Sequence, residues 1–516
     1  MGTEPPFQRE NQVKSRLTKL RERLREVHDL EAAVAVLGWD QRTYMPPGGA
    51  EARARQIGAL RRLAHEKFTD PAMGKLLDEL RPYEESLPYD SDDASLIRVT
   101  RRDYERAIRI PPSFKDEFDR NAALTYQVWT RARAEDDFAA VQPYLEKTLE
   151  LSRRYAAFFP EAEHPIDPLI AIVDEGITGA YLKQLFAELQ ANLIPVVQAI
   201  VEQPIPDDSC LVQHFPADRQ LEFGLQVIRR IGYDLDRGRE DLSEHPITTT
   251  VALDDVRITT RIHENYLPSA LLGTLHEAGH AIYEQNIRRE LEGTPIGRGA
   301  TYGVHESQSR LWENLVGRSH AFWEFFYPQL QAVFPDQLGS VSLDRFYRAV
   351  NRVKPGFFRV EADEVTYSLH CAMRFQLEVD LLDGRVAVRD LPQVWRERFY
   401  QTFGFAPTTD REGVLQEMNW YCGRIGGLYQ HFTLGNLMSV LWFEAATQAH
   451  PEIETEIAHG EFRTLRNWLT QTIYTHGRKF TIPELIERTV GGPLTPSAYL
   501  RYLRRKYGEL YGLSFQ

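Results

Sequence analysis

The stretch VKSRLTKLRERLREVHDLEAAVAVL, Val13 to Leu37, carries the pattern that decides the fold class. Its apolar residues recur at steps of three and four positions, at Leu17, Leu20, Leu24, Val27, Leu30, Val34 and Leu37. Because an α-helix turns by about 100° per residue, this spacing places them all on one face. The pattern predicts a long amphipathic helix that packs in a hairpin or a bundle.

Similar amphipathic stretches recur along most of the chain, separated by short breaks rich in Pro, Gly or Asp. They lie near residues 52–66, 92–108, 112–134, 136–158, 178–203, 342–353, 364–382, 430–448 and 496–510. One segment differs: in ITTTVALDDVRITTRI, Ile247 to Ile262, β-branched residues flank an Asp-Asp turn. The sequence therefore predicts an all-α, mainly helical fold with a small β-hairpin or sheet.

The length of the chain bears on its domain organisation, because 516 residues exceed what one hydrophobic core usually supports. Prolines at 165 and 168, and again at 204 and 206, mark the expected joints. We expect an N-terminal helical part over residues 1–205 and a second helical part over residues 206–516. The alternative is a single large helical unit with a cleft.

The composition argues against several classes of partner. With 42% hydrophobic and 26% charged residues, the chain is typical of soluble globular proteins. A net charge of −13 and a pI near 5.7 argue against nucleic acid or an anionic membrane as the main partner. The uncharged run from Ile425 to Phe443 contains Gln430, His431 and Asn436, so we interpret it as a buried helix beside a site rather than a membrane span.

Two features indicate a reducing compartment. Residues 1–16 lack the apolar core of a signal peptide and the pattern of a transit peptide. The three cysteines, Cys210, Cys371 and Cys422, lie far apart and are odd in number. We therefore expect a cytoplasmic protein without disulfides.

The segment LHEAGHAIYEQ, Leu275 to Gln285, predicts a metal site. Residues four apart on a helix lie within about 40° of each other, so His276 and His280 can share one zinc ion. Ser269 is the expected N-cap of this helix, which we place over residues 270–291. Glu277 would then lie beside the open metal position and act as general base.

A third ligand is needed to set this segment apart from a chance match on an ordinary helix. Glu306 in GVHESQSRLWENL, Gly303 to Leu315, supplies a carboxylate on a second expected helix, after a connection rich in Gly and Thr. Competing carboxylates are Glu284, Glu290 and Glu313. We interpret Glu284 and Glu313 as hydrogen-bond partners of the ligands or as structural groups.

Several further segments are similar to one known family. They are LGWDQRTYMPPGGAEARARQ from Leu37, the motif EHPIT, the trio Asp255, Arg257 and Thr259, the motif HESQ from His305, FRVEAD with Arg359, and the tail YLRYLRRKYGELY. Together with the histidine helix, they resemble the carboxypeptidase Taq family of metallocarboxypeptidases over nearly the whole chain.

This resemblance implies a fold, a cofactor and a set of site residues. It implies a two-lobed, all-helical homodimer with a deep groove, Zn²⁺ as the metal with Co²⁺ able to replace it, and peptides with a free C-terminus as substrates. His276, His280 and Glu306 would bind the metal and Glu277 would transfer protons. The candidate substrate-binding residues are Arg359, Arg257, His305 and Asn419. For the two arginines, a buried ion pair with Asp363 or Asp255 is the alternative.

The chain also departs from the family pattern. GVLQEMNW, Gly413 to Trp420, has Glu417 where the family has Asp and Asn419 where it has His, and Phe432 stands where an aromatic hydroxyl is usual. A phenylalanine cannot donate a hydrogen bond to an oxyanion, whereas Asn419, His431 or Tyr429 could. We therefore expect a somewhat divergent member that keeps its metal but has an altered rate or specificity.

The preferred function is a zinc metallocarboxypeptidase that releases single C-terminal residues from peptides through metal-activated water. The alternative is a degenerate family member that binds metal or peptide with little turnover. A purely structural helical scaffold ranks third. An aminopeptidase would need an acidic anchor for the free amine, and an endopeptidase an open cleft.

Overall fold

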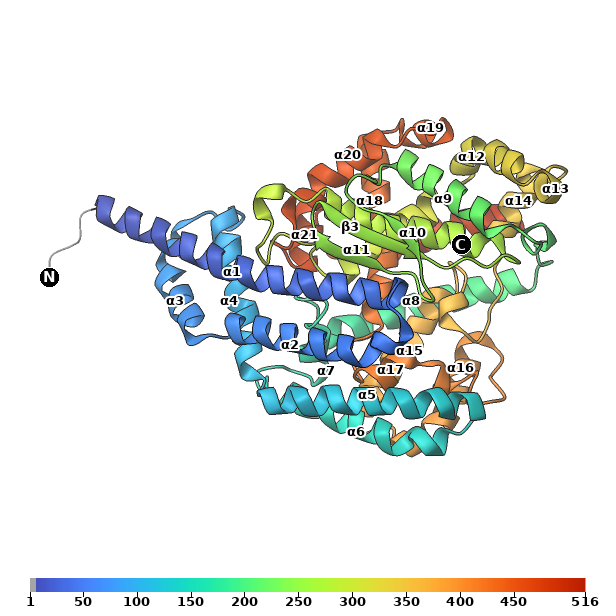
Figure 1. Ribbon diagram of the computed structural model, residues 1–516. Coiled ribbons are helices and arrows are strands. Elements are labelled where there is room, and N and C mark those ends of the chain that lie inside the picture. Colours follow the sequence, from blue (N-terminus) through green and yellow to red (C-terminus); the bar gives the residue numbers. More distant parts are fainter. Residues whose placement is uncertain (1–5, 516) are drawn as a thin grey trace.

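The computed structural model describes residues 6–515, and helices dominate it (Figure 1). Residues 1–5, which contribute to the expectation about targeting, lie outside the described part. The first helices are α1 (Pro6–Thr43), α2 (Ala50–Phe68), α3 (Pro71–Ser86), α4 (Asp92–Arg109), α5 (Pro112–Glu135), α6 (Phe138–Ala157), α7 (Ile166–Ile170) and α8 (Gly179–Val201). The predicted helical fold is confirmed.

The later part of the chain is also helical. Its helices are α9 (Ala217–Ile231), α10 (Leu267–Gln285), α11 (Tyr302–Arg310), α12 (His320–Val333), α13 (Pro335–Leu338), α14 (Leu343–Val350), α15 (Tyr367–Leu382), α16 (Leu391–Phe403), α17 (Met418–Cys422), α18 (Gln430–Ala449), α19 (Ile453–Ala458), α20 (Arg463–Thr472), α21 (Ile482–Thr489) and α22 (Ser497–Tyr511). The predicted division at residue 205 stays a prediction.

The long N-terminal helix is α1, and it packs along α2 as one arm of a hairpin (Figure 1). The first four residues of its predicted apolar face, Leu17, Leu20, Leu24 and Val27, are buried. The remaining three are half-buried, on the part of α1 that approaches the sheet. The three-four spacing thus predicted both the helix and the side that it buries.

The predicted hairpin consists of β2 (Thr248–Ala252) and β3 (Asp255–Thr260), which pair in antiparallel register. A third strand, β1 (Glu240–Leu242), pairs in parallel with β3 and was not predicted. Three residues are too few to show an alternating pattern. Since β3 packs on α10 and β2 on α1, the sheet lies between the N-terminal hairpin and the helix that carries the two histidines.

The histidine helix α10 differs at both ends from its predicted bounds. It begins at Leu267, so the prediction of Ser269 as N-cap was wrong, and Pro268 lies in its first turn. Proline is accepted there because the first N–H groups of a helix have no intrahelical acceptor. The helix ends at Gln285, and a separate 3₁₀ turn, Arg289–Leu291, follows.

Two glycines bring three helices into close contact. A Cβ atom at Gly279 of α10 would lie 2.7 Å from the carbonyl oxygen of Gln308 and from the Cα of Ser309. A Cβ atom at Gly435 of α18 would lie 2.6 Å from the Cγ of Glu306. Helix α11 is therefore held between α10 and α18 at backbone contact distance, and any larger residue would displace it.

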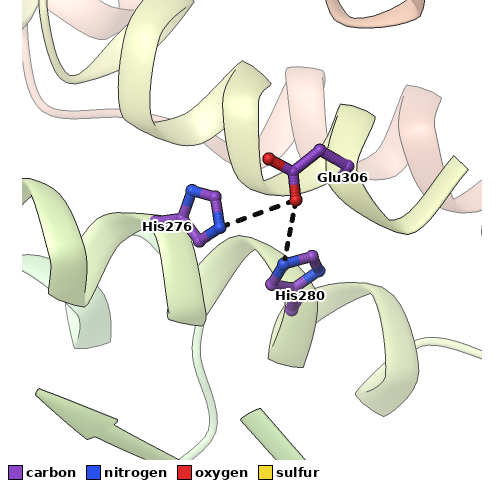
Figure 2. A group of neighbouring side chains, drawn as sticks. All are labelled: His276, His280 and Glu306. Atoms are coloured by element: carbon purple, nitrogen blue, oxygen red, sulfur yellow. Dashed lines mark ion pairs between the residues drawn. The ribbon is translucent and has the colours of Figure 1, made fainter. Parts of the chain in front are cut away.

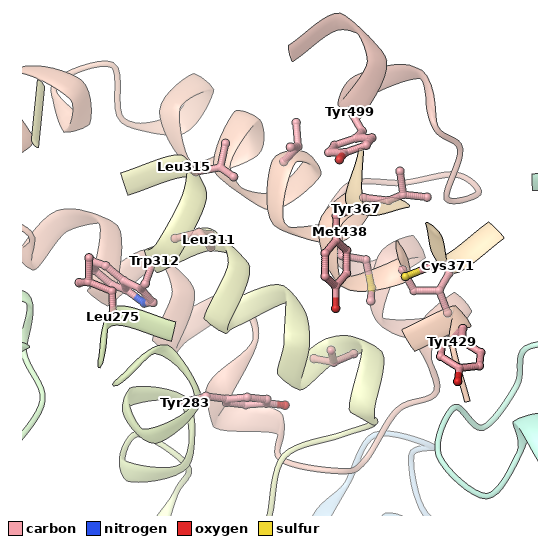
Figure 3. Close-up of a cluster of buried hydrophobic side chains, with 14 of the residues drawn as sticks. Leu275, Tyr283, Leu311, Trp312, Leu315, Tyr367, Cys371, Tyr429, Met438 and Tyr499 are labelled. Carbon is pink, nitrogen blue, oxygen red and sulfur yellow. The ribbon is translucent and has the colours of Figure 1, made fainter. Parts of the chain in front are cut away.

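An apolar cluster supports this three-helix layer (Figure 3). Leu275 and Tyr283 of α10, Leu311 and Trp312 just after α11, and Met438 of α18 are buried there. One described helix, α8, is long and apolar enough to cross a membrane by length and composition. It packs against α15 and α22, as a core helix does.

We predict that Gly279→Ala lowers the free energy of unfolding by about 1–3 kcal/mol, because the added methyl group must push α11 away from α10. Denaturant unfolding followed by circular dichroism measures the change. The matched control is Gly58→Ala, in the middle of α2, where an added Cβ meets no atom within 4 Å. The free energy of unfolding of this control should equal or exceed that of the parent, since Ala favours a helix more than Gly does. Equal stability of both variants would contradict the proposed close contact.

Candidate metal centre

Three side chains converge on one point between α10 and α11 (Figure 2). His276 and His280 project from α10 and Glu306 from α11, and their ligand atoms all lie within 4.8 Å of one another. The Oε2 atom of Glu306 is 3.8 Å from the Nε2 atoms of both histidines. The structure thus brings together the three residues that the sequence predicted as metal ligands.

This donor set fits a divalent ion. Two ligands bound at about 2.0–2.1 Å to a tetrahedral ion lie about 3.4 Å apart, close to the observed 3.8 Å. Two imidazole nitrogens and one carboxylate oxygen form a common catalytic zinc set, which leaves one coordination position open. The cluster can therefore bind a metal and still admit a substrate.

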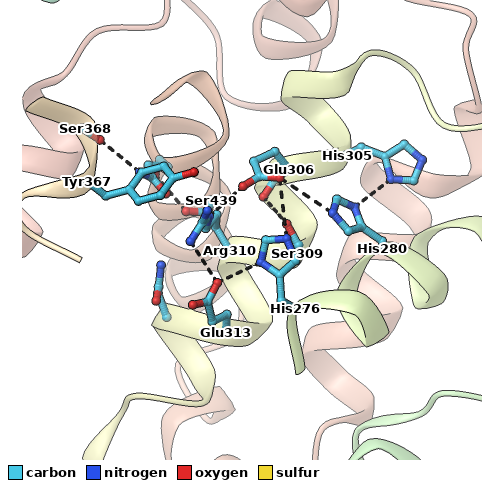
Figure 4. Close-up of polar contacts among 12 residues, drawn as sticks. His276, His280, His305, Glu306, Ser309, Arg310, Glu313, Tyr367, Ser368 and Ser439 are labelled. Atoms are coloured by element: carbon cyan, nitrogen blue, oxygen red, sulfur yellow. Dashed lines mark hydrogen bonds and ion pairs between the residues drawn. The ribbon is translucent and has the colours of Figure 1, made fainter. Parts of the chain in front are cut away.

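Each histidine is oriented through its other ring nitrogen (Figure 4). The Nδ1 of His276 lies 2.9 Å from Oε2 of Glu313, and the Nδ1 of His280 lies 3.0 Å from Nδ1 of His305. His305 in turn places its Nε2 2.6 Å from Oε1 of Glu284. Since a carboxylate only accepts, His305 donates from Nε2 and accepts from His280 at Nδ1, which leaves the Nε2 lone pair of His280 for a metal.

Arg310 joins the two carboxylates of this network. Its Nε donates to Oε1 of Glu306 over 2.8 Å, and its Nη1 donates to Oε2 of Glu313 over 3.0 Å. Burial alone raises the pKa of Glu313, but Arg310 and His276 together lower it to about 2. The sequence analysis missed Arg310, although its position four residues after Glu306 on one helix was a usable signal.

Glu277 is buried, with 7% of its surface exposed, and β2 holds its carboxylate. The hydroxyl of Thr248 donates to Oε2 of Glu277 over 2.6 Å and lies 3.0 Å from its backbone oxygen. Burial raises the pKa of Glu277, against the effects of His276 and Thr248. Thr248 lies in the EHPIT motif. Its contact with Glu277 depends on how the sheet packs against α10, so the sequence did not predict it.

Arg359 is buried beside aromatic rings and forms no ion pair with any residue that the structure describes. Its Nη1 donates to the hydroxyl of Tyr367 over 2.8 Å, its guanidinium carbon lies 4.6 Å from the ring centre of Phe432, and its Nε has no partner. The carboxylate of Asp363 instead accepts hydrogen bonds from backbone N–H groups, including that of Thr366. The alternative of an Arg359–Asp363 ion pair is therefore wrong.

Arg257 forms the ion pair with Asp255 that the sequence offered as the alternative to substrate binding. Its Nε and Nη2 donate to Asp255 over 2.8 and 2.7 Å, and its guanidinium lies 4.4 Å from the ring centre of Trp39. In the part of the chain that the structure describes, no hydrogen bond, ion pair or ring contact joins Arg257 to the three candidate ligands. Arg359 is thus the freer of the two arginines.

The residues that depart from the family pattern have separate environments. Glu417 forms a buried ion pair with Arg374 and accepts a hydrogen bond from the hydroxyl of Tyr429. Within residues 6–515, no such contact joins Asn419 to the metal cluster. His431 packs on Phe432 with ring centres 3.9 Å apart, and burial is the main cause that lowers its pKa to about 4. Its imidazole is therefore neutral at pH 7.

A cavity of about 670 Å³ reaches the hydrogen-bond network of the cluster at Glu284. Its walls come from α1, α4, α5, β2 and the connection between α10 and α11. A smaller cavity of about 300 Å³ shares Glu284, Arg298 and Arg478 with it, and His305 lines the smaller cavity. His305, which bonds His280, is therefore the residue of this network, with Glu284, that faces a cavity.

Comparisons with known proteins give one consistent result. The family model of carboxypeptidase Taq (M32) metallopeptidases matches residues 19–507. The chain is 39% identical to thermostable carboxypeptidase 1 of Thermus thermophilus and 36% identical to carboxypeptidase 1 of Bacillus subtilis, over 95% of this chain and 97% of each relative. It is similar to the crystal structure of the M32 carboxypeptidase of Deinococcus radiodurans R1, with a TM-score of 0.94 and 46% identity over 97% of this chain and all of that one.

We predict that His305→Phe weakens metal binding about 10- to 100-fold, because His280 loses the acceptor that orients it. Competition with a chelator measures the affinity. The control His320→Phe changes a half-exposed histidine on α12 that pairs with Glu324, and it should leave the affinity unchanged. If His305→Phe instead raises KM for peptides at unchanged metal affinity, His305 binds substrate and does not position a ligand.

Proposed function

The chain belongs to the carboxypeptidase Taq (M32) family of metallopeptidases, and from this premise we propose roles for its individual residues. It is a metallocarboxypeptidase, a hydrolase that acts on peptide bonds. The alternative of a degenerate member with little turnover has no support among these relatives. The roles below are supported above all by the convergence of His276, His280 and Glu306.

We propose that these three residues hold Zn²⁺, with Co²⁺ able to replace it. The support is the pair of imidazoles and the single carboxylate at tetrahedral spacing. A divalent ion held there lowers the pKa of a water molecule and polarises the scissile carbonyl group.

Glu277 is the proposed proton carrier. Its carboxylate takes the proton that the attacking water loses and later gives it to the leaving amine. The hydrogen bond from Thr248 fixes one carboxylate oxygen, which leaves the other free to face the water. Burial favours the protonated form of Glu277, so the carboxyl group can carry a proton between the two steps.

Arg359 is the proposed anchor for the terminal carboxylate of the peptide. A buried guanidinium that has no carboxylate partner among the described residues, and whose Nε is unpartnered there, is ready for a bidentate ion pair. The rings of Phe432 and Tyr429 surround it and exclude water, which strengthens the pair. Arg257 and Asn419 remain predicted substrate-binding residues.

We also propose a cytoplasmic homodimer. The dimer rests on the resemblance to the family. The compartment rests on the three cysteines, which are unpaired: Cys210 and Cys371 are buried and Cys422 is exposed. Unpaired cysteines are usual in the cytoplasm, because that compartment keeps thiols reduced.

We predict that Glu277→Gln keeps one bound metal ion per chain but loses about 10²- to 10⁴-fold in kcat, because glutamine cannot accept the proton. The assay follows release of the last residue from a peptide with a free C-terminus. The same peptide with an amidated C-terminus is the control and should resist the parent enzyme. Equal cleavage by the variant, or equal cleavage of the amidated peptide, would contradict the proposal.

A second prediction separates the two arginines. Arg359→Lys should lower kcat/KM for free peptides about 10- to 100-fold, mainly through KM, because an ammonium group cannot form the bidentate pair. Arg257→Lys is the matched substitution and should change kcat/KM much less, since its partner is Asp255. If Arg257→Lys causes the larger loss in steady-state kinetics, Arg257 is the anchor instead.

A further inference from the structure

The two ends of the metal cluster differ. On one side, Tyr367 links Arg359 to the cluster, because its ring also lies 4.4 Å from the guanidinium of Arg310, which bonds Glu313. On the other side, His305 and Glu284 line the smaller cavity. The substrate's direction follows, given the proposed anchor at Arg359: the terminal carboxylate lies on the first side, and the residues before the scissile bond extend past His305 into the cavities.

Two arginines, Arg298 and Arg478, line both cavities. Arg298 belongs to the connection between α10 and α11, and it lines both the cavity of about 300 Å³ and that of about 670 Å³. Arg298 is exposed, unlike its neighbours Gly297 and Gly299. Its neighbour in sequence, Gly299, donates its backbone N–H to Glu284, so the backbone at Arg298 is tied to the network that orients His280.

The other charged groups of the smaller cavity are already engaged. Arg478 and Arg102 both pair with Asp103. Glu175 accepts from Arg106. Glu284, finally, accepts from His305 and Gly299.

Arg298, by contrast, forms no hydrogen bond or ion pair within residues 6–515. Asp103, Glu31 and Glu284 attract its guanidinium without a direct contact, and Arg478 repels it. Glu31 and Asp103 line only the larger cavity, whereas Glu284 lines both. Among the described charged side chains that line the smaller cavity, Arg298 is therefore the one that no hydrogen bond or ion pair engages directly.

We propose that Arg298 gives this carboxypeptidase a preference for peptides with an acidic side chain, Asp or Glu, shortly before the scissile bond. The inference rests on the proposed function and on the anchor at Arg359. A carboxylate in the smaller cavity meets the free guanidinium of Arg298 with little competition from the paired charges around it. A lysine there meets like charge, which disfavours it.

The test compares tetrapeptides that share a neutral C-terminal residue and carry Glu, Gln or Lys at the second or third position from the C-terminus. The parent enzyme should show a kcat/KM about 10-fold higher for Glu than for Gln at one of these positions, and lowest for Lys. Arg298→Gln should abolish this preference, and Arg298→Glu should reverse it in favour of Lys. All three enzymes should cleave the Gln peptide at similar rates.

Arg289→Gln is the matched control, because this exposed arginine pairs with Asp254 on the surface, and it should keep the preference of the parent. Equal cleavage of the Glu, Gln and Lys peptides by the parent would overturn the inference while the proposed function stands. Should none be cleaved, the proposed function fails. Calorimetry then measures the binding of the same peptides to Glu277→Gln. Tighter binding of the Glu peptide, lost when Arg298→Gln is added to this variant, supports the inference. Equal binding of the Glu and Gln peptides refutes it.

Discussion

The close contact of three helices is the constraint on which the site depends. Gly279 lies between the two histidines on α10 and lets α11 approach to backbone contact, and Gly435 on α18 does the same from the other side. Glu306 is thereby fixed at 3.8 Å from two imidazole nitrogens. The three ligands come from two helices, and they can meet because glycine at position 279 has no side chain to keep the helices apart. The geometry of the metal site therefore depends on the packing of the core.

Polar groups around the ligands complete this arrangement. Glu313 and His305 orient the two histidines, and Arg310 compensates the charge of both carboxylates that it bonds. Buried charges are costly unless they are paired. The paired charges of Glu313 and Arg310 also hold the metal ligands in place. Arg359 is the exception, because it is buried and pairs with no acidic residue between positions 6 and 515. This is the environment expected of a group whose partner is the substrate.

Local patterns predicted a large part of this molecule. The three-four spacing predicted α1, the β-branched residues predicted the hairpin of β2 and β3, and helical spacing predicted the histidine pair. Contacts between distant segments could not be predicted, because no local sequence pattern indicates that Thr248 contacts Glu277 or that Arg359 is unpaired. The wrong N-cap, Ser269, shows the limit of residue preferences: Pro268 fits inside the first turn, so the helix begins three residues earlier, at Leu267.

The central claim is that His276, His280 and Glu306 bind one catalytic ion. A crystal structure of the zinc-loaded protein, with anomalous diffraction recorded at the zinc edge, tests it most directly. We predict a single strong anomalous peak about 2.0–2.2 Å from the Nε2 atoms of both histidines and from the carboxylate of Glu306. A peak elsewhere, or one with Glu284 or Glu313 as the third ligand, would contradict the account.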